Sequence, residues 1–129
     1  MPVSTTTAGR ALEDRVARQL TKAGFRFVRQ PVMGGLRPDF LITGPGEQRV
    51  VVETKAWNPV AHNIARAAGQ AAYYQALAGA DKAFVVLPPL GGKRGARGVV
   101  GADDLVDAVA TYFTKPSTAD VKARVPRRH

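Results

Sequence analysis

The strongest constraint on this chain is a pair of apolar segments separated by the turn residues Gly44, Pro45 and Gly46. The first segment covers residues 38–43, and the second covers residues 49–57 and contains three consecutive valines. Two apolar segments around glycine and proline are typical of a β-hairpin. The sequence therefore predicts two antiparallel strands, with the centre of the hairpin near Gly46.

Other periodic segments lie on both sides of this hairpin. Leu12, Val16 and Leu20 recur at every fourth position, which predicts an amphipathic helix over residues 11–23. Phenylalanines alternate with an arginine at the start of residues 25–32, and this indicates a strand before the hairpin. The predicted order thus begins with one helix and three strands.

The second half of the chain predicts a further helix and strand. Asn58 is placed as a helix N-cap with Pro59 at the first helical position, and the alanine-rich helix continues to about Gly79. A buried strand is expected at 83–87, a basic loop at 91–98, a short edge strand at 98–100, and a last helix after Asp103 or Asp104. This order predicts an α/β domain with a central mixed sheet of four to five strands flanked by helices.

Length and charge narrow the class of protein. A chain of 129 residues is expected to form one domain over 1–129, with 1–9 and 116–129 flexible. Nineteen Lys and Arg against ten Asp and Glu leave a net charge of +9, which favours a polyanionic partner, because each cation that meets a phosphate releases a counterion. The alternative is that this charge serves only solubility.

The absence of certain residue types and segments is also informative. The chain has no cysteine, which excludes disulfides, thiolate metal sites and cysteine nucleophiles. The N-terminal segment has no apolar core of a secretion signal, and no apolar stretch is long enough to span a bilayer. We therefore expect a cytoplasmic protein without membrane contact, in which oxygen or imidazole ligands hold any metal.

Two acids and a lysine are predicted to meet on the hairpin. Asp39 and Glu53 lie seven residues before and after Gly46, so antiparallel pairing places them opposite or nearly opposite each other. Lys55 follows Glu53 by two residues and shares its face of the strand. Paired carboxylates repel each other unless a cation neutralises them, which makes them suitable ligands for Mg²⁺ or Mn²⁺. The alternative is a surface hairpin with a single ion pair.

These residues resemble the signature of the PD-(D/E)xK, or restriction-endonuclease-like, nucleases: Pro38-Asp39, then thirteen residues, then Glu53-Thr54-Lys55. The resemblance covers residues 9–87 and implies a core with helix, three strands, helix and strand. It implies that Asp39, Glu53 and the backbone carbonyl of Thr54 bind the metal. Glu13 stands where family members commonly carry a metal-binding glutamate on the first helix. The alternative is that Glu13 is an ordinary surface glutamate.

Gln70 and Tyr74 resemble the Gln-x-x-x-Tyr motif of the RecB-like branch, in which these residues are associated with the active site and DNA. A spacing of four places both on one face of a helix. The alternative is that a tyrosine in an alanine-rich helix packs into the core, or that Tyr73 is the important one.

Several basic and aromatic residues are weaker candidates. Arg37, Lys93, Arg94 and Arg97 are expected to contact phosphates, or else to be solvated charges. Trp57 is a candidate for stacking on a base or sugar, or for closing the end of the core. His62 is a candidate proton carrier, with a solvated histidine as the more ordinary interpretation.

Together these features predict a Mg²⁺- or Mn²⁺-dependent deoxyribonuclease in which a metal-activated water attacks the phosphodiester. Within the family, one alternative is a junction-resolving enzyme, typically a small basic homodimer. The other is a RecB-like nuclease, alone or as a subunit of a larger defence or repair complex. From another class, the alternative is a non-catalytic nucleic-acid-binding module on the same scaffold. The sequence leaves open DNA against RNA and endonuclease against exonuclease action.

Overall fold

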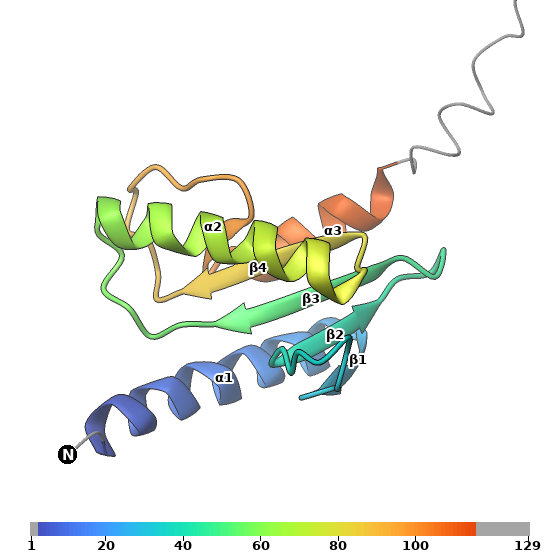
Figure 1. The fold of residues 1–129 in the computed structure, drawn as a ribbon, viewed down its shortest axis with the longest axis horizontal. Coiled ribbons are helices and arrows are strands. Elements are labelled where there is room, and N and C mark those ends of the chain that lie inside the picture. The colour runs from blue at the N-terminus through green and yellow to red at the C-terminus, as the bar shows by residue number, and fades with distance from the viewer. Residues whose placement is uncertain (1–2, 116–129) are drawn as a thin grey trace, which may run out of the picture.

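The structure is a computed structural model that describes residues 3–115 (Figure 1). Its elements follow the predicted helix, three strands, helix, strand order, and a short strand and a helix complete it. They are α1 (Val3–Ala23), β1 (Arg26–Arg29), β2 (Phe40–Thr43), β3 (Arg49–Thr54), α2 (Ala61–Ala78), β4 (Lys82–Leu87), β5 (Val99–Gly101) and α3 (Leu105–Thr114).

The strands form one five-stranded mixed sheet in the order β1-β2-β3-β4-β5. Neighbouring strands are antiparallel from β1 to β3 and parallel from β3 to β5. A parallel pair needs a crossover connection, and α2 supplies it between β3 and β4. The prediction of an α/β domain with a mixed sheet between helices is confirmed.

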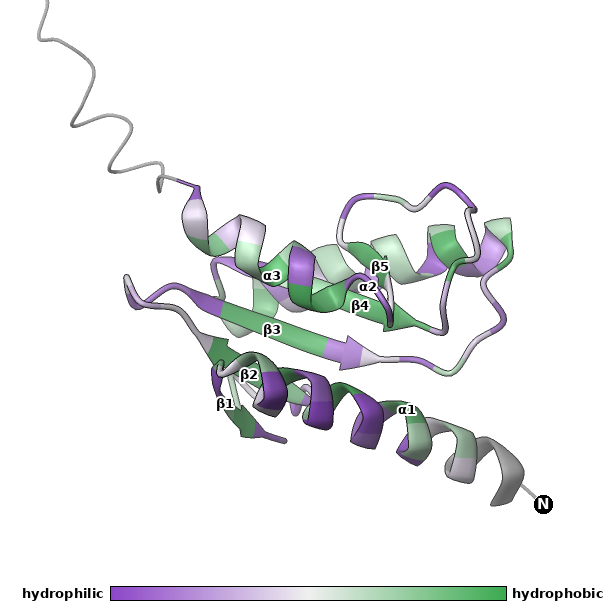
Figure 2. Cartoon of the chain, turned by 180° about the vertical axis from the view of Figure 1, so that it is seen from behind, coloured by the Kyte–Doolittle hydropathy of each residue, from purple (hydrophilic) through white to green (hydrophobic). Residues whose placement is uncertain are grey.

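Helices cover both faces of the sheet. α2 lies over one face (Figure 1), and α1 and α3 lie over the other, where Figure 2 shows α1 turning a hydrophilic side outward. Side chains of β2, β3 and β4 alternate between the two faces, and this alternation separates a larger core under α1 and α3 from two smaller clusters under α2. The apolar sheet is therefore buried on both sides, as expected for strands rich in valine.

Phe40 is the side chain whose loss should destabilise this core most. It is fully buried, and its ring packs edge to face against Phe27 with centroids 5.7 Å apart. Because the removed volume lies between two layers, we expect Phe40→Ala to lower the free energy of unfolding by about 3–5 kcal/mol. Chemical denaturation measures this, and Val28→Ala on the neighbouring strand, 57% exposed, is the control at about 0.5 kcal/mol or less. Equal losses in the two variants would contradict this account of the core.

Two helix starts differ from the predictions. α1 begins at Val3, not at residue 11, because no helix-breaking proline follows Val3 and an established helix extends at low cost. The predicted start of α2 at Asn58 and Pro59 is wrong: α2 begins at Ala61, and its N-cap, Val60, makes no side-chain capping bond. The amide of Val60 donates to the carbonyl of Asn58 at 2.8 Å, so this segment is a turn that leads from β3 into the helix.

Three further predictions concern the two ends of the chain, the start of α3 and membrane spans. Residues 3–9, predicted to be flexible, belong to α1, whereas 116–129 lie outside the described residues. Asp104 is the N-cap of α3 by position, but its side chain makes no capping bond. Within residues 3–115, no helix combines the length and apolarity that crossing a bilayer requires.

Candidate active site

The hairpin between β2 and β3 brings Asp39 and Glu53 together. Phe40 pairs with Val52, so Asp39 and Glu53 are the next residues along the two strands. The backbone amide of Asp39 donates to Glu53 Oε1 at 3.2 Å. The turn at Gly44-Pro45-Gly46 sets this register, and the register places the two acids opposite each other on the paired strands.

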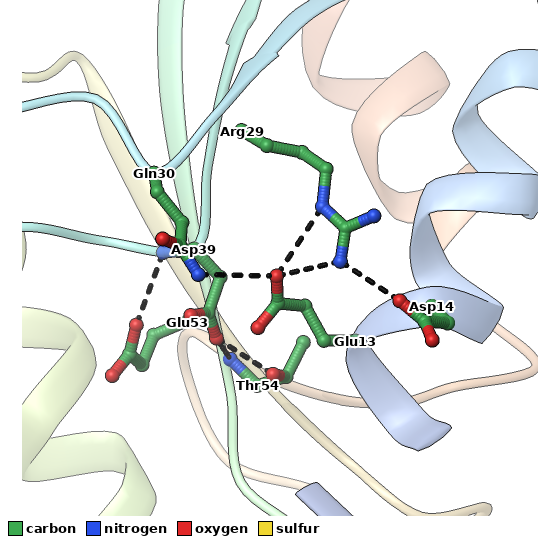
Figure 3. Close-up of polar contacts among 7 residues, drawn as sticks. All are labelled: Glu13, Asp14, Arg29, Gln30, Asp39, Glu53 and Thr54. Atoms are coloured by element: carbon green, nitrogen blue, oxygen red, sulfur yellow. Dashed lines mark hydrogen bonds and ion pairs between the residues drawn. The ribbon is translucent and has the colours of Figure 1, made fainter. Parts of the chain in front are cut away.

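Thr54 holds the side chain of Asp39 in place (Figure 3), and Gln30 holds its backbone. Its Oδ2 accepts hydrogen bonds from the Thr54 amide at 2.7 Å and from Thr54 Oγ1 at 2.6 Å. Its backbone carbonyl accepts a bond from the Gln30 amide at 2.7 Å, and Gln30 has a positive φ of 51° where the chain leaves β1. These contacts fix one carboxylate oxygen, and Asp39 Oδ1 accepts no hydrogen bond from residues 3–115.

Glu53 forms the second half of the site with a lysine and a tyrosine. Its Oε2 lies 3.4 Å from Lys55 Nζ and accepts a hydrogen bond from the hydroxyl of Tyr74 at 3.1 Å. The side chain of Glu53 is only 12% exposed and that of Lys55 30% exposed. Tyr74 reaches Glu53 from α2, so the sheet and the helix over it both contribute to the site.

The environment disfavours the charged form of Glu53. Burial raises its pKa above the ordinary value, and the nearby Asp39 carboxylate raises it further, while Lys55 and Tyr74 act in the opposite direction. Burial and the Glu53 carboxylate raise the pKa of Tyr74 to about 12. Tyr74 is therefore a neutral hydrogen-bond donor at physiological pH, and the two acids form a site where a cation would relieve electrostatic repulsion.

Glu13 lies across the site from Glu53, with Asp39 and Thr54 between them in Figure 3. Its carboxylate pairs with the guanidinium of Arg29 at 2.7 Å, and Arg29 also pairs with Asp14 at 2.9 Å. Hydrogen bonds to Glu13 and then to Asp14 raise the pKa of Arg29. Among residues 3–115, Glu13 does not join Asp39 and Glu53 in a group of three acids that could hold a metal, so its role as a ligand stays a prediction.

Gln70 and Tyr74 lie one helical turn apart on α2. Tyr74 donates a hydrogen bond to Glu53, whereas the side-chain oxygen of Gln70 is buried and accepts no hydrogen bond from the described part of the chain. A buried amide oxygen without a donor is costly, so this is a position where a water or ligand would be favoured. The structure thus places Tyr74 at the site and leaves the part played by Gln70 as a prediction.

The predicted phosphate contacts lie on the surface and not among the acids. Arg37, Lys93, Arg94 and Arg97 are all exposed. Arg97 lines an open groove between α2 and α3 together with Lys82 and Lys115. His62 is exposed at the start of α2, and no described contact links it to the acids. Their contact with nucleic acid stays a prediction.

Two contributors at or near the site were not predicted. Gln30 holds the backbone of Asp39, and only the tertiary position of the β1 end reveals this. The guanidinium of Arg66 lies 4.4 Å from the centroid of the Trp57 ring, which Lys55 Nζ approaches at 5.7 Å. The sequence held one signal for Arg66, because it precedes Gln70 by one helical turn.

The groups at this site that could bind a metal are the carboxylate oxygens of Asp39 and Glu53, with the backbone of Thr54 beside them. Such a set suits hard cations such as Mg²⁺ or Mn²⁺ and is unsuited to metals that prefer sulfur. Comparison of the chain with family models, curated proteins and solved structures found no match. The chemistry of the site must therefore be inferred from the residues themselves.

Proposed function

We propose that this protein is a divalent-metal-dependent nuclease of the PD-(D/E)xK type that hydrolyses phosphodiester bonds of DNA. The observation that carries the proposal is the meeting of Asp39, Glu53 and Lys55, with Lys55 Nζ 3.4 Å from Oε2 of a glutamate whose side chain is 12% exposed. The two partly buried carboxylates repel each other and Lys55 is the only cation paired with them among residues 3–115, so the site favours a further bound cation. The net charge of +9 suits a polyanionic substrate.

Asp39, Glu53 and the backbone carbonyl of Thr54 are the groups that would hold Mg²⁺ or Mn²⁺. The bound ion supplies Lewis-acid polarisation of the phosphate and lowers the pKa of a bound water. Asp39 can offer its Oδ1 while Thr54 keeps Oδ2 in place. The protein thus contributes to ion binding by holding the two carboxylates in fixed positions that are partly buried from solvent.

Lys55 and Tyr74 are the groups that act around the acids. The ammonium of Lys55 can stabilise the negative charge that develops on the phosphate oxygens or orient the attacking water. The hydroxyl of Tyr74 keeps its proton and donates a hydrogen bond to Glu53 throughout the physiological pH range, because the pKa of Tyr74 is about 12. This bond fixes the Glu53 carboxylate and adds no ionisation of its own.

The direct test is hydrolysis of DNA by the purified protein. Linear, circular, single-stranded and four-way-junction DNA are each incubated with Mg²⁺, with Mn²⁺ and with chelator. We expect cleavage that needs the divalent ion and that Asp39→Asn removes, while circular dichroism of the variant stays unchanged. Metal-free, salt-dependent DNA binding with no cleavage of any substrate would instead indicate a non-catalytic module.

The raised pKa of Glu53 predicts an unusual acid limb in the pH dependence of activity. Glu53 must be ionised to act, so activity is lost as the pH falls through a pKa that lies above that of an ordinary glutamate. A divalent cation favours the ionised form, so more Mg²⁺ should move this limb to lower pH. Values of kcat/KM measured against pH at two Mg²⁺ concentrations test this. If kcat/KM fell at the same pH at both Mg²⁺ concentrations, the role given to Glu53 would be contradicted.

A further inference from the structure

Trp57, which Lys55 approaches from one position, also contacts a second cation, Arg66. The indole of Trp57 is half-buried and packs with Ile64 and Leu87 in the cluster under α2. The Arg66 guanidinium carbon lies 4.4 Å from the centroid of this ring. A cation over the face of an indole ring is attracted by the negative charge of that face, which favours this conformation of the Arg66 side chain over the others. Trp57 therefore holds Arg66 in a defined place.

The positive charge of Arg66 is not neutralised by the part of the chain that the structure describes. Arg15, Arg26 and Arg29 each pair with a carboxylate, whereas no ion pair among residues 3–115 includes Arg66. Lys55, which approaches the same indole ring, has Glu53 as its partner. One face of the site thus has Lys55 paired with Glu53, and beside the same indole ring lies Arg66, which is exposed and has no ion-pair partner among residues 3–115.

The position of Arg66 on α2 relates it to the proposed nuclease centre. Arg66, Gln70 and Tyr74 are spaced by four residues, which places them along one side of the helix. Tyr74 donates to Glu53, and Arg66 lies two turns toward the N-terminus of α2 and one indole ring away from Lys55. A strand whose phosphate sits at the acids would meet Arg66 with a phosphate farther along the same strand.

We propose that Arg66, supported by Trp57, is a binding site for a backbone phosphate that flanks the phosphate at the acids. A guanidinium is planar and donates two parallel hydrogen bonds, and this geometry matches a phosphate. The contact carries no sequence information, because it reaches only the backbone. This inference rests on the proposed nuclease function for the place of the strand, but its test does not need hydrolysis.

The experiment measures DNA affinity without divalent metal. A short fluorescent duplex is titrated with the full chain, in chelator, by fluorescence anisotropy over a series of salt concentrations. The variants are Arg66→Ala, Arg66→Lys and the control Arg18→Ala. Arg18 is an exposed arginine on α1 across the sheet, and it has no ion pair within residues 3–115. Alanine is the best helix former, so Arg66→Ala should keep α2 intact, and thermal unfolding verifies this.

We expect Arg66→Ala to weaken binding by roughly three- to tenfold and to reduce the slope of log K against log[salt] by about one phosphate contact. Arg66→Lys should keep the slope but bind more weakly than wild type. A lysine retains the positive charge but lacks the two parallel N–H donors of the guanidinium. Arg18→Ala should change neither quantity. If Arg66→Ala matches Arg18→Ala in both affinity and slope, the phosphate site is overturned.

The outcome also separates this inference from the proposed function. Arg66-dependent binding in a protein that cuts no DNA would support the phosphate site and contradict the proposed nuclease function. Metal-dependent cutting abolished by Asp39→Asn, with Arg66→Ala indistinguishable from Arg18→Ala, would do the reverse. The stacking of a base on Trp57 predicts a third pattern, in which Trp57→Leu weakens binding while Arg66→Ala does not, and this pattern would also overturn the proposal.

Discussion

Replacing Lys55 with alanine is expected to lower the single-turnover rate of DNA hydrolysis by about 10²–10³-fold while DNA binding and Mn²⁺ binding persist. Lys55 Nζ lies 3.4 Å from Glu53 Oε2, and its side chain is 30% exposed, so it can face both the acid and a substrate phosphate. The loss should fall on the chemical step, because the ammonium stabilises charge that appears only in the transition state. Single-turnover kinetics at saturating protein measure this step.

Lys22→Ala is the matched control for Lys55. Lys22 is an exposed lysine in the last turn of α1, and its removal lowers the net charge by the same amount. Its single-turnover rate should stay within about threefold of wild type, since the charge of an exposed lysine is screened by salt. A Lys55→Ala enzyme that reacts as fast as Lys22→Ala would show that the ammonium takes no part in the chemistry.

Replacing Glu53 with glutamine is expected to have the largest effect, a loss of hydrolysis of about 10³-fold or more, because the ion's contribution of several kcal/mol is lost. The substitution keeps the shape of the side chain but removes one of two charges that would bind the cation. Mn²⁺ should raise the unfolding temperature of the wild type and leave that of Glu53→Gln unchanged, since a ligand stabilises only a protein that binds it. Differential scanning fluorimetry with and without Mn²⁺ measures the difference.

The unfolding temperature without metal distinguishes a metal site from a structural ion pair. Burial and Asp39 raise the pKa of Glu53, so its negative charge is unfavourable in the folded protein at neutral pH. Glu53→Gln should therefore unfold at the same temperature as wild type, or higher, in chelator. Glu47→Gln is the control in the same hairpin, because Glu47 is exposed and pairs with Arg26 only at 3.4 Å. A marked destabilisation confined to Glu53→Gln would favour the structural role.

The hairpin explains how much of the site the sequence could predict. Turn residues at 44–46 determine the register, and a register with period two places Asp39 against Glu53 and puts Lys55 on the same face. These are local relations between neighbouring strands, so pattern and spacing suffice. The α/β class and the order of elements follow in the same way from apolar periodicity.

Relations between distant elements could not be predicted in this way. Arg29 pairs with Glu13 because β1 packs beside α1, and no spacing in the sequence encodes that contact. Trp57 meets Arg66 because the segment after β3 packs against α2, and no spacing in the sequence encodes this contact. The Asn58-Pro59 pattern also misplaced the start of α2, which begins at Ala61. Boundaries of helices and long-range ion pairs depend on tertiary packing, which overrides local propensity.

The most direct test of the central claim locates a paramagnetic ion on the protein. Mn²⁺ broadens nuclear magnetic resonance signals of nearby amides, and a 13.7 kDa chain is small enough for assigned spectra. Substoichiometric Mn²⁺ should selectively broaden the amides of residues 39–40 and 53–55, and Glu53→Gln should abolish this effect. Broadening centred on other acids, such as Asp103, Asp104 and Asp107, or none at all, would contradict a metal site between Asp39 and Glu53.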